Sequence, residues 1–166
     1  TPSAIPAQPT GKPLFDLIAA VLVVAFLVVG SWSAYWAEHR NDQYQLITLG
    51  QCVYNGGQLY LDCWENKPPG IAWINALGLV LSPGGQLGVW VLPAATALLC
   101  IIPLWYAVGR LLGPTAGRRT AVLASILASW RLYDAPSINP DFYSAMFELA
   151  AVALWLPALF ASFSVR

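Results

Sequence analysis

Long apolar runs separated by short polar segments dominate the pattern of this chain. The first run, residues 14–34, reaches the length of about 20 residues that a helix needs to cross a bilayer, and Asp16 is its only charge. Two further long runs cover 86–109 and 142–163. A shorter run over 119–133 can cross if its ends lie in the interface. We therefore predict an all-α integral membrane protein with four transmembrane helices over these segments.

The segment between the first two spans, residues 35–85, is too long for a simple connection. Its apolar stretch 70–81 is too short to cross a bilayer and is bounded by two prolines and by the sequence SPGG. We expect an interfacial helix there, with Trp73 and Asn75 facing the headgroups. A second interfacial helix is predicted over 42–54, whose uneven apolar face consists of Leu46, Ile47, Leu49 and Val53.

The positive charges orient the chain in the membrane. Arg110, Arg118 and Arg119 fall in the sequence RLLGPTAGRR, which we expect to be a loop, and the positive-inside rule places it in the cytoplasm. Four crossings then put both termini in the cytoplasm, together with Lys12 and Arg166. The segment 35–85 becomes a long first extracytoplasmic loop. Most carboxylates gather on that outer side, namely Glu38, Asp42, Asp62, Glu65, Asp134 and Asp141.

Composition agrees with this topology. Hydrophobic residues make up 58% of the chain and charged residues 10%, which is typical of a membrane protein. The first run is too long for a signal peptide, so we expect it to remain in the mature protein. The proline-rich residues 1–13 are expected to form a mobile tail before one membrane domain over 14–166. A formal net charge of +0 without a basic cluster argues against nucleic-acid partners.

Two aspartates on the outer side are candidates for chemistry. Asp42 follows the first span, and Asp141 begins the fourth. Brought together, two carboxylates can bind a divalent cation, or one can act as a general base. The competing interpretation is a helix N-cap or a solvated interfacial acid. His39 is the only histidine, which argues against a His-based metal site or catalytic triad.

Lys67 is a candidate for binding phosphate. Pro68 and Pro69 restrict the backbone beside it, so its ammonium group is held at headgroup depth. A cation at that depth suits a lipid-linked phosphate or pyrophosphate. The alternative is a lysine that reaches anionic lipid and pairs with Glu65.

The remaining polar residues suggest structural roles. Glu148 lies inside the fourth predicted span, where an isolated carboxylate is costly, and Arg131 at the outer end of the third is a candidate partner. Cys52 and Cys63 both lie in the outer loop, where the spacing permits either a disulfide or two free thiols. Cys100 falls within the second predicted span and is expected to serve packing.

Several segments in order resemble the N-terminal part of the GT-C glycosyltransferases. They are an early acid in a long first outer loop, then YLDCWENKPPGIAWINALG, WVLPAATALL, YAVGRLLG and INPDFYSAM. The group concerned contains the dolichyl-phosphate-mannose protein mannosyltransferases and the bacterial aminoarabinose transferases, and KPPG is the most specific element. The resemblance runs from residue 42 to about residue 159, which corresponds to a truncated family member.

The resemblance implies roles for individual residues. Asp42 matches the catalytic or metal-linked acid of the first loop, Lys67 the lysine that meets the carrier phosphate, and Asp141 the acid of the second loop. The sugar donor would be a polyprenyl-phosphate sugar, used at the outer face of a bacterial inner membrane. The sequence also departs from the family, because Gln43 stands where a second acid is common and Val91 where an arginine is common.

Two functions follow from these observations. The first is the N-terminal module of a polyprenyl-phosphate-sugar-dependent glycosyltransferase, with Asp42 and Asp141 as catalytic or metal-binding residues and Lys67 and Glu65 as substrate-binding residues. The second is a non-catalytic scaffold or accessory subunit of a larger respiratory, photosynthetic or transport complex in the membrane. Eight tryptophans and seven tyrosines would then anchor the chain to lipid and to protein partners.

Overall fold

The computed structural model describes residues 13–36, 41–64, 66–83, 87–129 and 140–163, and helices are the regular secondary structure of these ranges. The all-α prediction is therefore confirmed. Two segments, Pro13–Ser33 and Leu87–Leu112, are long and apolar enough to cross a membrane. The helices are α1 (Pro13–Trp36), α2 (Asn41–Tyr54), α3 (Pro69–Leu81), α4 (Leu87–Leu112), α5 (Pro114–Ser129) and α6 (Pro140–Phe163).

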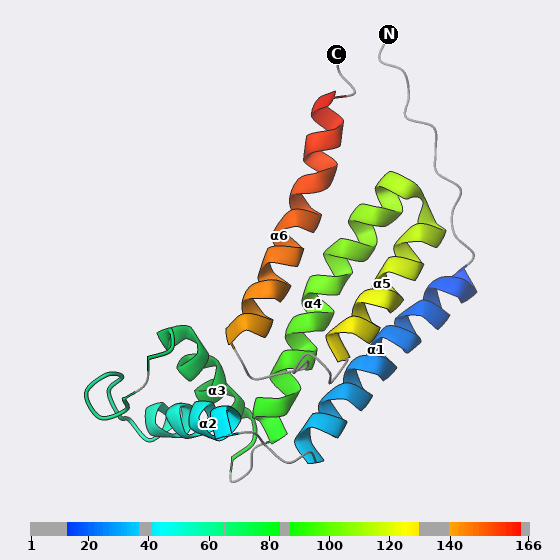
Figure 1. Ribbon diagram of the computed structural model, residues 1–166. Helices are drawn as coiled ribbons and strands as arrows, with labels where there is room; N and C mark the ends of the chain where they lie inside the picture. Colours follow the sequence, from blue (N-terminus) through cyan, green and yellow to red (C-terminus); the bar gives the residue numbers. More distant parts are fainter. Residues whose placement is uncertain (1–12, 37–40, 65, 84–86, 130–139, 164–166) are drawn as a thin grey trace.

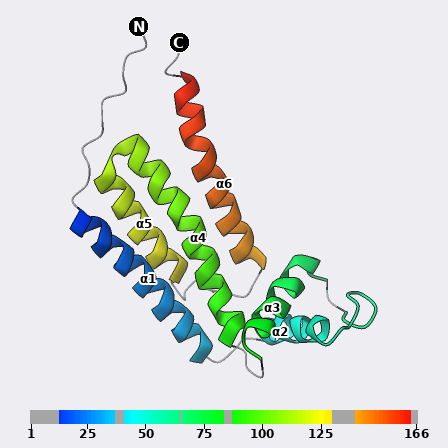
Figure 2. The ribbon, with the colours of Figure 1, turned by 180° about the vertical axis from the view of Figure 1, so that it is seen from behind.

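Four helices form a bundle in which α4 is central. Helix α4 packs against α1, α5 and α6, and α1 also packs against α5 (Figure 1). The two shorter helices, α2 and α3, pack against each other, and α3 joins them to α4. Both views place this pair beside one end of the bundle, while the start of α1 and the end of α6 lie at the other end (Figure 2). We call α2, α3 and the segment between them the cap.

The junction between α4 and α5 differs from the expected loop. Arg110 belongs to α4, and Arg118 and Arg119 belong to α5, so most of RLLGPTAGRR is helical. Gly113 ends α4 with a φ of 96°, which favours glycine, and Pro114 then occupies the first position of α5. The bundle reverses direction within one residue, and the third long helix begins at 114 rather than 119.

Helix α1 buries one face in the bundle and exposes large apolar side chains on its other faces. On α1, a stripe containing Ala19, Val23 and Leu27 is buried against the neighbouring helices. Leu17 and Val21 point away from the bundle and are 61% and 58% exposed. Lipid acyl chains are about as apolar as leucine side chains, so they are suitable partners for exposed apolar side chains of a helix. The exposed apolar surface of α1 therefore suits contact with lipid.

Glycines allow close backbone contacts between α3 and α4 and between α2 and α3. A Cβ on Gly78 of α3 would lie 2.6 Å from Val89 Cα of α4, and one on Gly88 would meet the carbonyl oxygen of Gly78. A Cβ on Gly50 of α2 would lie 2.5 Å from Asn75 Cβ of α3. The backbones approach so closely at these crossings that a methyl group would separate them. The position of α3 on α4 is therefore tightly determined.

The prediction that Asn75 faces the headgroups is wrong. Its side chain is fully buried, and its Nδ2 donates a hydrogen bond of 3.0 Å to the carbonyl oxygen of Leu46 in α2. Burial of an amide in an apolar interface requires such a partner, so this contact fixes α2 against α3. Trp73, on the opposite face of α3, is 62% exposed, which leaves it accessible to an interface.

Candidate functional site

A disulfide closes the connection between α2 and α3. Cys52, on the last turn of α2, is bonded to Cys63, with their Cα atoms 6.1 Å apart and a sequence separation of 11. The chain leaves α2 through Gly56, whose φ is 90°, and Gly57 then packs directly against both sulfur atoms. A side chain at Gly57 would collide with the disulfide, so glycine is required there.

A compact turn follows under the disulfide. The Gln58 N–H donates a hydrogen bond of 2.9 Å to Oδ2 of Asp62, and the Asp62 N–H donates one of 2.9 Å to the carbonyl oxygen of Gln58. Between them, Tyr60 adopts a left-handed φ of 67° and donates its N–H to the Cys63 carbonyl oxygen at 2.9 Å. Asp62 thus closes a turn, which gives this outer acid a structural role.

The same turn holds the backbone of Lys67. The Tyr60 hydroxyl donates a hydrogen bond of 3.1 Å to the Lys67 carbonyl oxygen. Pro68 follows with an extended ψ of 145°, and Pro69 is the first residue of α3. The Lys67 side chain is exposed, and it makes no ion pair within the described ranges. Its ammonium group is therefore presented to solvent from a constrained backbone.

The N-terminus of α3 adds positive potential beside Lys67. The N-cap residue Pro68 makes no side-chain hydrogen bond to this helix end. The second residue, Gly70, is exposed, and a Cβ added there would meet no atom within 4 Å. The first N–H groups of a helix and the helix dipole both favour an anion at this position. A lysine and an open helix start together form a candidate phosphate site.

The predicted acidic residues occupy different positions. Asp141 is the second residue of α6, and its side chain is exposed. Figures 1 and 2 place the start of α6 and the start of α3 at the same end of the bundle. Asp42 is the second residue of α2, but its side chain lies outside the described part of the structure, as do Glu65 and Arg131. The predicted pairs Asp42 with Asp141 and Arg131 with Glu148 therefore remain predictions.

Two other expectations concern a metal and the third cysteine. Within the described ranges, no group of three or more His, Cys, Asp or Glu side chains is placed to hold a metal ion. The divalent cation expected at Asp42 and Asp141 stays a prediction, because the Asp42 side chain is outside these ranges. Cys100 is buried in α4 with 3% exposure, which agrees with its predicted packing role.

A groove between α2 and the disulfide turn, with a lining of both apolar and polar side chains, was not predicted from the sequence. It has a volume of about 480 Å³, and the turn that leads to Lys67 forms one of its walls. Trp64 on its rim is 84% exposed, and Tyr44 is 52% exposed. The sequence signal was available in the aromatic residues around Cys63, but only the charged residues were interpreted as functional. The groove is lined by Tyr44, Gln45, Thr48, Leu49, Cys52, Asp62, Cys63 and Trp64.

These features define a helical membrane protein with a disulfide-braced cap at one end of its bundle. The family model described as dolichyl-phosphate-mannose-protein mannosyltransferase matches residues 66–162, which is more than half of the chain. The chain therefore belongs to this family and is a GT-C-like, glycosyltransferase-related membrane protein. The matched region begins one residue before Lys67 and includes Asp141, whereas Asp42 lies before it. No curated protein and no solved structure matches the chain.

Proposed function

We propose that the chain carries the phosphate-binding part of a GT-C glycosyltransferase that takes its sugar from a polyprenyl-phosphate carrier. The observation that carries this proposal is the constrained backbone of Lys67 directly before the exposed start of α3. Family membership supports it, because the matched region contains both Lys67 and Asp141. A phosphate at this position would meet one full positive charge and the positive end of a helix dipole.

The proposal includes a topology. Helices α1, α4, α5 and α6 cross the bilayer, both termini are cytoplasmic, and the cap lies in the outer interface of a bacterial inner membrane. Arg118 and Arg119 support this orientation, since they lie near the start of α5, at the end of the bundle away from the cap. The positive-inside rule assigns such an end to the cytoplasm.

In the proposed reaction, Asp42 accepts a proton from the hydroxyl group of the acceptor. The acceptor oxygen forms a bond to the anomeric carbon of the sugar while the bond from that carbon to the carrier phosphate oxygen breaks. Lys67 stabilises the negative charge that develops on the departing phosphate, and Glu65 orients this lysine. Asp141, from the start of α6, positions the sugar.

The experiment is a sugar-transfer assay with protein purified from native membranes together with any companion chains. Lys67→Gln is expected to lower kcat/KM by about 100-fold, because a charge-assisted contact to the leaving group is lost. Lys67→Arg should retain more activity, since the charge remains. Asp42→Asn is expected to abolish transfer. The matched control is Arg110→Gln, which removes a cation from α4 outside the proposed site. Full activity of Asp42→Asn or Lys67→Gln would refute this mechanism.

A non-catalytic accessory subunit is the second candidate, and one feature of α6 favours it. Glu148, Val152 and Trp155 follow a helical spacing of four and three residues and are all exposed. A carboxylate on a lipid-facing surface is costly, so a cation or hydrogen-bond donor from another helix would stabilise it. Copurification at fixed stoichiometry with a respiratory, photosynthetic or transport complex, without transferase activity, would support this role. A homogeneous, active transferase would exclude it.

A further inference from the structure

A wide groove lies between α1 and α5, on the bundle surface away from the cap. Its volume is about 630 Å³. Most of its lining is aliphatic or aromatic, and arginine side chains lie at one end. The lining residues are Phe15, Ile18, Ala19, Leu22, Thr115, Arg118, Arg119, Val122, Leu123 and Ile126.

The length of the groove matches one leaflet of a bilayer. The lining residues on α5 run from Thr115 to Ile126. With a rise of 1.5 Å per residue, this distance along the helix is about 16 Å. Half of a hydrocarbon core of about 30 Å is about 15 Å. An acyl chain lying along the groove would therefore extend from the arginine end to about the middle of the membrane.

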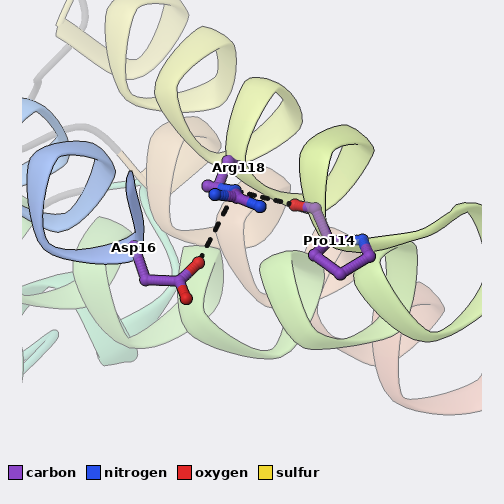
Figure 3. Close-up of polar contacts among 3 residues, drawn as sticks. All are labelled: Asp16, Pro114 and Arg118. Atoms are coloured by element: carbon purple, nitrogen blue, oxygen red, sulfur yellow. Dashed lines mark hydrogen bonds and ion pairs between the residues drawn. The ribbon is translucent and has the colours of Figure 1, made fainter. Parts of the chain in front are cut away.

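The arginine end has a defined electrostatic structure, shown in Figure 3. Arg118 Nε lies 3.5 Å from Oδ1 of Asp16 and donates a hydrogen bond of 3.2 Å to the carbonyl oxygen of Pro114. The Arg118 guanidinium also lies over the ring of Phe15, 5.7 Å from its centroid. The Arg118 side chain is only 14% exposed. Arg118 is thus used to join α1 to α5, and Asp16 offsets its charge.

Since Asp16 offsets the charge of Arg118, Arg119 provides the net positive charge at the arginine end of the groove, which we call the groove mouth. It is exposed, it lines the same groove, and no ion pair involves it within the described ranges. Thr115, one turn earlier on α5, is also exposed and provides a hydroxyl donor. Two arginines and one aspartate give the mouth a formal charge of +1. A cation and a hydroxyl above an apolar groove are complementary to a lipid whose headgroup is anionic.

We propose that this groove binds an anionic phospholipid of the leaflet opposite the cap. The phosphate contacts Arg119 and Thr115, and one acyl chain lies between Ile18 and Leu22 of α1 and Leu123 of α5. The apolar lining disfavours a water-soluble anion. A zwitterionic lipid would gain the same acyl contacts, but its cationic group would reduce the attraction to Arg119. This site is separate from the phosphate site proposed at Lys67, which lies at the other end of the bundle.

The test measures phospholipid binding to the purified chain in neutral detergent by native mass spectrometry. Equal amounts of phosphatidylglycerol and phosphatidylcholine are offered. We expect phosphatidylglycerol to bind more tightly, and Arg119→Gln to weaken this preference about fivefold. Arg110→Gln is the matched control, because Arg110 is an exposed arginine of α4 that does not line the groove and contacts Tyr106 instead. It should leave the preference unchanged.

A second variant tests the acyl chain contact. Leu123 is 57% exposed in the groove, so Leu123→Trp fills the groove without entering the core. It is expected to lower binding of both lipids. Equal binding of the two lipids, or equal losses in Arg119→Gln and Arg110→Gln, would overturn the proposal. So would efficient disulfide formation between two copies of a Leu123→Cys variant in the membrane, because a second chain would then occupy the groove.

Discussion

The cap and the α1–α5 end of the bundle hold their helices in different ways. In the cap, a disulfide, a buried amide hydrogen bond and close glycine contacts determine the positions of short helices. At the α1–α5 end, a partly exposed ion pair and apolar contacts leave a wide groove. Directional and covalent contacts fix geometry more narrowly than apolar contacts do. The cap is therefore suited to hold reacting groups, and the α1–α5 end to accept lipid.

The largest expected effect on the cap comes from Gly78→Val. The new Cβ would lie 2.6 Å from Val89 Cα and 2.7 Å from Val89 N, and backbone atoms cannot move aside as a side chain can. We expect a loss of about 3 kcal/mol in the stability of the α3–α4 contact. Amide hydrogen exchange in α3 should then become about 100-fold faster. Gly70→Val is the control on the same helix, since its Cβ meets no atom within 4 Å, and it should change exchange only slightly.

Removal of the disulfide is expected to have the next largest effect. The double variant Cys52→Ser, Cys63→Ser opens a loop of sequence separation 11, which should destabilise the turn by about 2–3 kcal/mol. Faster exchange and protease cleavage within residues 55–67 would show this. The bundle should stay folded, because the disulfide joins two residues of the cap. Equal destabilisation of α4 would contradict the view that the cap is a separately braced unit.

The smallest effect is expected from Tyr60→Phe. This change removes the hydroxyl that donates to the Lys67 carbonyl oxygen, a single exposed hydrogen bond worth about 0.5–1.5 kcal/mol. If Lys67 binds the carrier phosphate, the affinity for the donor should fall while the fold remains intact. Tyr54→Phe, at the end of α2, is the control because it lies outside the turn. Unchanged donor affinity would show that the backbone at Lys67 is held by its two prolines alone.

Much of the helical pattern could be predicted from the sequence, because membrane helices and apolar periodicity leave a strong local signal. Helices α2 and α3 are present where interfacial helices were expected, over 42–54 and 70–81, and their contact with the membrane interface stays a prediction. The loop predicted between α4 and α5 was too long. Gly113 and Pro114 let the chain reverse its direction within one residue, so the arginines on both sides belong to helices. Local composition does not reveal how abruptly such a turn is made.

The tertiary contacts of the site were harder to predict. Asn75 looked like an interfacial polar residue, and its partner is a backbone carbonyl 29 positions earlier in the chain. Sequence spacing carries no information on such a contact. The two prolines after Lys67 indicated a constrained backbone there, but the contact from Tyr60 depends on a left-handed turn that no simple pattern identifies. Asp62 was counted among the carboxylates of the outer side, and its part in closing that turn could not be read from the sequence.

The most direct test of the proposed site determines on which side of the membrane three residues lie. Lys67→Cys, Asp141→Cys and Arg119→Cys are made singly in a Cys100→Ala background and exposed to a membrane-impermeant thiol reagent. We expect labelling of the first two from the extracytoplasmic side of sealed vesicles and of Arg119→Cys only from the cytoplasmic side. Labelling of Lys67→Cys and Asp141→Cys from opposite sides would contradict a shared phosphate and sugar site at the cap.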